Sequence, residues 1–186
     1  SGKEKVAICG YHGWHDWYLA ANLGDVTGLD GHLLPGLEPN GVPRDLKGSS
    51  LPFSYNDFES LEQLMQQHED IGVIKMEVSR SEPPKAGFLE SVRKLASEKN
   101  IVLIFDECTS GFRETYGGLH SKYGVDPDMA IFGKAMGNGY AITAAIGKRE
   151  VMEAAQSTFI SSTFWTERIG PTAGLKTLEI MEREAS

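Results

Sequence analysis

Two side chains that could act together on a carbonyl cofactor follow apolar runs of the chain. Asp106 comes directly after the run 101–105, and Lys134 follows the run 129–132 after a single glycine. A neutral lysine amine forms a Schiff base with an aldehyde, and a fixed carboxylate keeps a pyridine nitrogen protonated. The pair therefore predicts a site for a cofactor that carries an aldehyde on a pyridine ring, as pyridoxal phosphate does.

To bring the two side chains together, such a site needs strands that end at the same edge of a sheet. The apolar runs of the sequence predict such strands. Apolar runs bounded by turn residues are typical of buried parallel strands, which bind ligands at their carboxyl ends. Helical spacing of apolar residues predicts helices around 61–65 and 88–96, with Asp57 capping the first, and a last helix over 172–184 after a proline. The alternation predicts an α/β fold: a three-layer, mostly parallel sheet with helices on both faces. The predicted strands are 6–9, 73–78, 101–105, 129–132, 142–146 and 159–162.

Composition argues against several classes of protein. The chain has 186 residues, 40% of them hydrophobic, which suffices for the core of one domain. Its formal charge of −8 disfavours a nucleic-acid or anionic membrane surface. No signal peptide and no apolar span of about 18 residues is found, so we expect a cytoplasmic protein with Cys9 and Cys108 reduced. Residues 21–56 are rich in Gly, Pro, Asn and Asp without a steady period, which predicts a long loop.

Other interpretations of the same residues stay open. An apolar strand followed by Asp106 and Glu107 also occurs in P-loop nucleotide hydrolases, but the chain has no Gly-x-x-x-x-Gly-Lys-Ser/Thr loop. A metal-dependent hydrolase site could be formed by His12, His15 and Asp16 together with Asp106. Two imidazoles do not suffice for a metal ion, however, and need further ligands. A turn stabilised by these side chains is favoured, and no metal site is predicted. The chain could also be a non-catalytic fragment that binds no cofactor.

Five segments resemble successive motifs of the class III pyridoxal-phosphate-dependent aminotransferases, in the family's order. The family includes glutamate-1-semialdehyde aminomutase, which the chain also resembles. The resemblance implies a pyridoxal 5'-phosphate enzyme that moves an amino group between a small-molecule amine donor and a carbonyl acceptor. The alternative is an aminomutase, which moves the group within one molecule. The segments are Gly-Tyr-His-Gly-Trp-His-Asp at 10–16, Phe-Asp-Glu-Cys-Thr-Ser-Gly-Phe-Arg at 105–113, Gly-Val-Asp-Pro-Asp at 124–128, Gly-Lys-Ala-Met-Gly-Asn-Gly at 133–139 and Ser-Thr-Phe at 162–164.

The resemblance implies roles around the cofactor ring for residues of the second and fourth motifs. Lys134 matches the catalytic lysine that forms the Schiff base. Asp106 matches the partner of the ring nitrogen. Cys108 stands where an aliphatic residue usually packs against one ring face, and Thr109 lies near the ring hydroxyl. These residues would hold the ring and its reactive carbon.

Further cofactor contacts are implied in other segments. Tyr11 matches the aromatic residue that covers the other ring face, and His12 helps to complete its turn. Glu77 matches a glutamate that faces the site from a strand end. Thr163 matches a threonine that reaches the cofactor phosphate of the neighbouring subunit, which implies a homodimer with shared active sites.

The resemblance also implies how much of an enzyme these residues represent. Residues 1–186 correspond to a partial large domain of fold type I. The upstream phosphate-binding loop and the small carboxyl-terminal domain of the family are expected to lie outside them.

Overall fold

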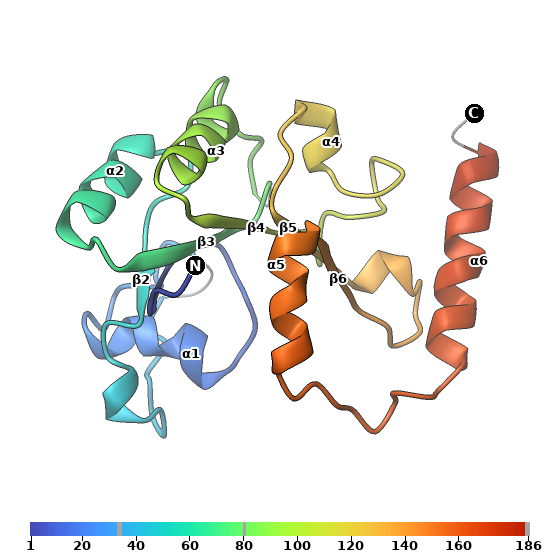
Figure 1. The fold of residues 1–186 in the computed structure, drawn as a ribbon, viewed down its shortest axis with the longest axis horizontal. Helices are drawn as coiled ribbons and strands as arrows, with labels where there is room; N and C mark the ends of the chain where they lie inside the picture. Colours follow the sequence, from blue (N-terminus) through green and yellow to red (C-terminus); the bar gives the residue numbers. More distant parts are fainter. Residues whose placement is uncertain (33–34, 80, 185–186) are drawn as a thin grey trace. The chain divides into compact units, whose positions relative to one another are not determined.

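The computed structural model describes residues 1–32, 35–79 and 81–184, and it divides into two units (Figure 1). The first unit comprises Ser1–Glu77 and Glu82–Leu103, and the second comprises Val78–Ser81 and Ile104–Ser186. None of the helices within the described ranges has the length and apolar character that a membrane crossing needs.

Three parallel strands form the sheet of the first unit. They are β1 (Lys5–Cys9), β2 (Ser50–Pro52) and β3 (Ile71–Met76), and β1 lies in the middle. Helices α2 (Phe58–Gln67) and α3 (Phe88–Glu98) cover one face, while α1 (Asp16–Leu19) and the 3-10 helix Ala20–Leu23 cover the other (Figure 1). The predicted layers of helix, sheet and helix are therefore present in this unit.

Alternation along β1 explains the two cores of this unit. Successive side chains of a strand point to opposite faces. Ile8 packs on the α1 side in a cluster with Tyr18, Ala21 and Leu29, whereas its strand neighbour Ala7 is also fully buried. A strand that is apolar on both faces must be covered on both, as parallel sheets are.

The two helices α2 and α3 follow their predicted patterns. The carboxylate of Asp57 accepts a hydrogen bond from Ser60 N at 3.1 Å, so the predicted cap of α2 is confirmed. Gly87 precedes α3 with a φ of +82°, a conformation that glycine adopts without steric cost. The predicted apolar face of α3 is buried: Phe88, Leu89, Val92, Leu95 and Ala96.

The second unit contains the strand ends that position the predicted site. Residues 104–106 of β4 (Val102–Asp106) pair in parallel with β5 (Met129–Phe132), and β6 (Ala144–Gly147) pairs with β5 in the antiparallel direction. Together with the two parallel pairings of the first unit, these pairings are mixed but mostly parallel, which confirms the predicted fold class. The helices are α4 (His120–Tyr123), α5 (Arg149–Met152) and α6 (Ile169–Glu184), with 3-10 helices at Lys134–Met136 and Glu153–Ser157.

Two predictions for irregular segments were wrong. Residues 159–162 do not form a strand, and Phe159 is 95% exposed, because no strand within the described residues pairs with this segment. The stretch 21–56 is not one loop, since it contains β2 and the 3-10 helices Ala20–Leu23 and Arg44–Leu46. Strand β2 is too short to show a period, and Pro52 in it fits an edge position because proline has no N–H to donate.

The remaining strands and helix were predicted with shifted ends. β3 runs over 71–76 instead of 73–78, β4 over 102–106 instead of 101–105, and β6 begins two residues later than predicted, at Ala144. The last helix begins at Ile169, before Pro171, because proline is tolerated in a first turn. The side chain of Glu167 caps it by accepting from the amides of Ile169 and Gly170.

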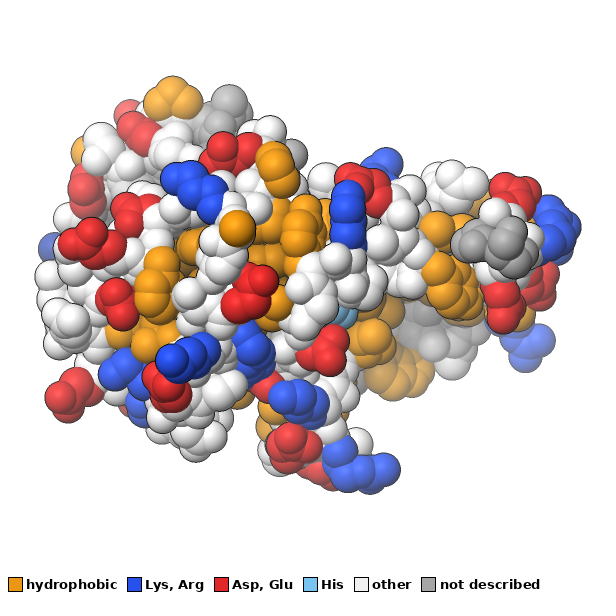
Figure 2. Space-filling model, turned by 90° about the horizontal axis from the view of Figure 1, so that it is seen from above, with side chains coloured by type: hydrophobic (Ala, Val, Ile, Leu, Met, Phe, Trp, Pro, Cys, Tyr) orange, Lys and Arg blue, Asp and Glu red, His pale blue; other side chains and the backbone are white. Residues whose placement is uncertain are grey.

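Charged side chains of both signs are mixed on one face of the molecule. Figure 2 shows acidic and basic side chains interspersed on the face that it presents, with hydrophobic side chains between them. Neither sign forms a continuous patch on that face, so it lacks the basic stripe that binds nucleic acid.

Candidate functional site

Lys134 lies where β5 gives way to a short 3-10 helix. Its Nζ donates a hydrogen bond to Thr109 Oγ1 at 2.8 Å. Its φ is +42°, in the left-handed region that side-chain-bearing residues rarely adopt. The preceding residue must be small, because a Cβ on Gly133 would lie 2.7 Å from Cys108 Sγ. A strained backbone fixed by close packing is typical of functional positions.

Asp106 is the last residue of β4, at the same sheet edge as Lys134. Its partner in the parallel ladder is Ile131, so β4 and β5 end side by side. The carboxylate is buried, and its Oδ1 accepts from Cys108 N at 3.2 Å. The structure thus brings together four of the predicted site residues at one edge: Asp106, Cys108, Thr109 and Lys134.

Glu107 fixes the loop that carries Cys108 and Thr109. This carboxylate is fully buried. Oε1 accepts from His120 N at 2.9 Å and from His120 Nδ1 at 2.8 Å, and Oε2 accepts from Leu119 N at 3.0 Å and from Ser110 Oγ. Burial raises the pKa of Glu107, but these hydrogen bonds outweigh it and hold the pKa below its usual value. A carboxylate with four donors is an anchor for the loop and has no lone pair left to receive a substrate proton.

The anchoring role of Glu107 was not predicted from the sequence. The only signal was a second acidic residue after a buried strand. Its partners at 119 and 120 are brought to it by the turn at 111–118, which has no periodic pattern to predict it.

The loop continues to Arg113 through two constrained residues. Gly111 N donates to Glu107 O at 2.8 Å, and a Cβ on this glycine would lie 2.6 Å from the ring of Phe132. Phe112 has a φ of +56° and packs edge-on against that same ring, with centroids 5.3 Å apart. Arg113 Nε then donates to Thr109 O at 2.6 Å. Backbone and side-chain contacts therefore define the course of the loop.

The other predicted site residues of the first unit form a cluster of their own. Tyr11 N donates to Glu77 Oε2 at 3.0 Å, and Glu77 N donates to Cys9 O at 3.1 Å. Gly10 makes this possible, because its φ is +108° and a Cβ there would lie 2.5 Å from Glu77 Oε2. Buried His12 lies edge-on to the ring of Tyr18, with centroids 5.9 Å apart. The resulting cluster lies at the carboxyl ends of β1 and β3.

His15 has a structural role in the first unit. Its Nδ1 accepts from Tyr18 N at 3.3 Å as the cap of α1, and its Nε2 lies 3.0 Å from His12 O. Both ring nitrogens are therefore engaged. Across the ranges that the structure describes, no three His, Cys, Asp or Glu side chains are grouped so that they could hold a metal ion.

Thr163 lies in the irregular segment before α6 and is exposed. It forms no hydrogen bond within the described part of the chain, while its neighbours Ser162 and Phe164 line a cavity with Lys134. The structure therefore does not bring Thr163 into contact with the other predicted residues.

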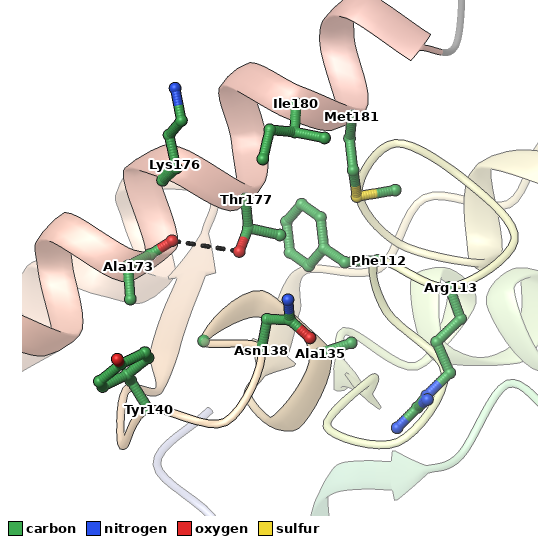
Figure 3. A pocket seen from close by; sticks show the side chains of 11 residues that line it. Phe112, Arg113, Ala135, Asn138, Tyr140, Ala173, Lys176, Thr177, Ile180 and Met181 are labelled. Atoms are coloured by element: carbon green, nitrogen blue, oxygen red, sulfur yellow. Dashed lines mark hydrogen bonds between the residues drawn. The ribbon is translucent and has the colours of Figure 1, made fainter.

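Two cavities of the second unit adjoin this edge. The larger, of about 1360 Å³, is lined by residues that include Cys108, Arg113, Lys134 and Tyr140. The smaller, of about 570 Å³, lies beside α6, and Figure 3 shows its lining residues. Thr177 Oγ1 in its wall donates to Ala173 O at 3.1 Å (Figure 3). Arg113 lines both cavities.

Comparison with known proteins places this geometry in a family. The model of the class-III aminotransferases matches residues 38–186. The chain is 41% identical to a 3-aminobutyryl-CoA aminotransferase of Cloacimonas acidaminovorans (strain Evry), covering 99% of this chain and 42% of the relative. It is 36% identical to a glutamate-1-semialdehyde 2,1-aminomutase of Natranaerobius thermophilus, covering 100% of this chain and 44% of the relative.

Solved structures of other proteins share the fold of this chain. An omega-transaminase from Sphaerobacter thermophilus is 28% identical and superposes with a TM-score of 0.81, covering 97% of this chain and 44% of its own. The FumI protein of Sphingopyxis sp. MTA144 shares the fold at a TM-score of 0.82 and 24% identity, with 97% and 42% covered. The chain spans less than half the length of these relatives. On the matched motifs and fold, it belongs to the class-III aminotransferase family.

Proposed function

We propose that the full-length protein is a pyridoxal-phosphate-dependent aminotransferase that moves an amino group from a small-molecule amine donor to a carbonyl acceptor. Family membership supports this, but one observation carries it. The Lys134 amine is held 2.8 Å from Thr109 Oγ1, at the edge where β4 ends in the buried Asp106 carboxylate. An amine and a carboxylate at one strand edge are the two groups that this cofactor requires.

The residues of the second unit fit pyridoxal phosphate chemically. Lys134 would attach the cofactor covalently, and Asp106 would hold the ring nitrogen in its protonated form. Thr109 would hydrogen-bond the ring hydroxyl, and Cys108 would pack against one ring face. When bound, the cofactor supplies an electron sink for the carbon that loses its proton.

The transfer of the substrate proton would be carried out by side chains of the protein. Lys134 Nζ would remove the proton from the amino-bearing carbon of the donor and later return a proton, acting as general base and then as general acid. Thr109 Oγ1 accepts a hydrogen bond from that nitrogen and so restrains its position. Asp106 Oδ1 accepts from the amide of Cys108 at 3.2 Å, which holds the carboxylate in place at the end of β4.

The remaining parts of the proposal concern the whole protein. We propose that residues 1–186 are a partial large domain, and that Tyr11, His12 and Glu77 complete the cofactor site. We also propose a homodimer in which Thr163 reaches the partner's cofactor phosphate. The exposed aromatic residues beside it, Phe164 and Trp165, support an interface there. We also propose a cytoplasmic location, where Cys9 and Cys108 would stay reduced; within the described residues neither forms a disulfide.

Covalent trapping tests the proposal. The full-length protein is incubated with pyridoxal phosphate, reduced with borohydride and mapped by peptide mass spectrometry. We expect the label on Lys134, and loss of label and cofactor absorbance in Lys134→Ala. Lys94→Ala, in which an exposed lysine of α3 is removed, should keep both. A label spread over other lysines, or none, would exclude the assignment.

The aminomutase is the second candidate, because a relative with 36% identity carries that name. A labelled amino nitrogen distinguishes the two. In an aminotransferase the donor alone releases a carbonyl product and leaves its nitrogen on the protein. In an aminomutase one substrate alone is converted to its isomer, and no carbonyl product is released.

A further inference from the structure

We propose that Gly170, in the first turn of α6, is a positioning residue for Lys134. It lets the helix lie directly against the loop 134–142, and this contact fixes the backbone that carries the Lys134 amine. The assignment rests on the proposed function, and it adds a residue that acts on the reacting amine through the loop. All of the residues concerned belong to the second unit.

The contact between α6 and this loop is made through glycines. The buried residues of α6 are Gly170 and Gly174, which lie four positions apart and so share one face of the helix. An added Cβ at either position would lie near Ile142 of the loop. Figure 3 shows α6 beside the turn that carries Ala135 and Asn138. The absence of side chains at the two glycines therefore lets helix and loop approach closely.

At Gly170 there is no space for a side chain. A Cβ there would lie 2.5 Å from Ala141 O and 3.3 Å from Ile142 Cβ. The oxygen belongs to the backbone, so no side-chain rotation could relieve the clash. Gly170 does not have a positive φ, and alanine is the better helix former. The close approach of the loop is therefore the reason that this position requires glycine.

Gly174 provides a matched comparison on the same helix. A Cβ there would lie 3.5 Å from Ile142 Cδ1 and 3.8 Å from Met136 O, which are ordinary van der Waals distances. Alanine therefore fits at 174 but not at 170. Because the two positions share a helix face and a neighbour, substitutions at each separate crowding of the loop from a change in helix propensity.

The first turn of α6 is held by hydrogen bonds of its own. Glu167 Oε2 accepts from Gly170 N at 3.1 Å, and the other carboxylate oxygen accepts from Ile169 N. Thr172 donates to Arg168 O from its amide at 3.0 Å and from its hydroxyl at 2.6 Å. Since the helix end is fixed in this way, a Cβ on Gly170 would displace the loop.

The loop transmits such a displacement because its backbone is tightly turned. Asn138 N donates to the carbonyl oxygens of Lys134 and Ala135, both at 3.1 Å. Tyr140 N donates to Gly137 O, also at 3.1 Å. Lys134 and Asn138 have φ values of +42° and +45°, which persist only where the surrounding structure sustains them. Few backbone torsions between 134 and 141 are therefore left to absorb a movement.

The size of the expected effect follows from the distances. A contact of 2.5 Å must lengthen by about 1 Å to become an ordinary van der Waals contact. The Lys134 amine lies 2.8 Å from Thr109 Oγ1, and a displacement of that order would break this hydrogen bond. A misplacement of about 1 Å at a reacting group slows a reaction about 100-fold.

Two probes test the role on the full-length protein freed of cofactor. Pyridoxal phosphate must condense its aldehyde with the Lys134 amine, with loss of water, and this capture is followed by absorbance and by borohydride trapping. Deoxypyridoxine phosphate has a methyl group in place of the aldehyde, so its dissociation constant measures non-covalent binding alone. Hydrogen exchange of peptides that span 134–142 is measured without either probe.

The variants differ in where they change the packing. Gly170→Ala crowds the loop, and Gly174→Ala is the control on the same helix face. Gly147→Ala is the control for general destabilisation, because its Cβ would lie 2.6 Å from Asp128 O, at the end of β5 away from the loop. Ile142→Val removes the Cδ1 methyl that faces Gly174, and it creates no clash.

We expect Gly170→Ala to capture pyridoxal phosphate about 100-fold more slowly than the wild type. Its affinity for deoxypyridoxine phosphate should stay unchanged, and exchange at 134–142 should be faster. Ile142→Val should show the same pattern in a weaker form. Gly174→Ala should behave as the wild type in all three measurements. Gly147→Ala should lower the melting temperature without slowing capture selectively.

Four outcomes would overturn the assignment. A wild-type capture rate in Gly170→Ala would mean that the loop accommodates the added Cβ. Equal losses with both probes would mean that Gly170 supports the whole pocket and not the lysine. The same selective loss in either glycine control would mean that the effect does not arise at this contact. If Gly170→Ala does not fold, unchanged capture and exchange in Ile142→Val would refute the role.

The label on Lys134 in the wild type separates this assignment from the proposed function. Where that label is present, any of the four outcomes removes the positioning role while the proposed function stands. Absence of the label would remove both.

Discussion

Replacing Glu107 with glutamine tests whether this buried carboxylate holds the site loop. Each of its oxygens accepts two hydrogen bonds: Oε1 from the amide and the ring of His120, and Oε2 from the amide of Leu119 and from Ser110. A glutamine of the same shape keeps one acceptor oxygen but turns an NH₂ group toward the other pair of donors. A hydroxyl can rotate and become an acceptor, but a backbone N–H cannot.

The magnitude follows from the amide that loses its acceptor. A buried donor left unsatisfied costs about 1–3 kcal/mol. In Glu107→Gln the amide of either Leu119 or His120 loses its acceptor. We therefore expect the free energy of local opening of the loop to fall by about 2 kcal/mol, which corresponds to about 30-fold faster amide exchange. Alanine would remove all four bonds and should cost more.

Hydrogen exchange measured by mass spectrometry on the full-length protein is the assay, because it reports on the peptide that contains 119 and 120 separately from the rest. Glu98→Gln is the control, since that carboxylate is exposed and its distance to Lys94 is 3.9 Å. Unchanged exchange at 119 and 120 in Glu107→Gln would refute the anchoring role, as would an equal effect of the control.

Three further predictions follow from the structure. Hydrogen bonds hold the pKa of Glu107 below its usual value, so its ionised form stabilises the folded loop. Amide exchange at 119 and 120, corrected for intrinsic rates, should therefore stay slow at any pH above the ordinary glutamate pKa. It should accelerate as the pH falls through the lower pKa of the folded state. Burial, together with the charge of nearby Glu77, raises the pKa of Cys9 to about 12. Iodoacetamide near neutral pH should therefore label Cys108, which lines the cavity, and leave Cys9 unlabelled. Equal labelling of the two cysteines would contradict this prediction. Gly111→Ala would place a Cβ 2.6 Å from Phe132 and should lower the melting temperature, whereas Gly31→Ala meets nothing within 4 Å and should not.

The sequence by itself determined the strands that carry the site and the two residues at their ends. Consecutive apolar residues predict a buried strand, so β4 and β5 could be located from the sequence. Asp106 and Lys134 could then be placed at or just after the ends of these strands. Motif order then indicated the family, because each motif occupies a fixed place along the chain.

Only the tertiary structure decided which groups meet and which segments pair. Tyr11 N reaches Glu77, and His120 reaches Glu107, across parts of the chain that show no mutual pattern. The three-residue strand β2 forms because it can pair with β1. The segment 159–162 is irregular because no strand in the described part of the chain pairs with it. Periodicity is a local property, whereas the partner of a polar group or of a strand edge is set by where distant residues come together.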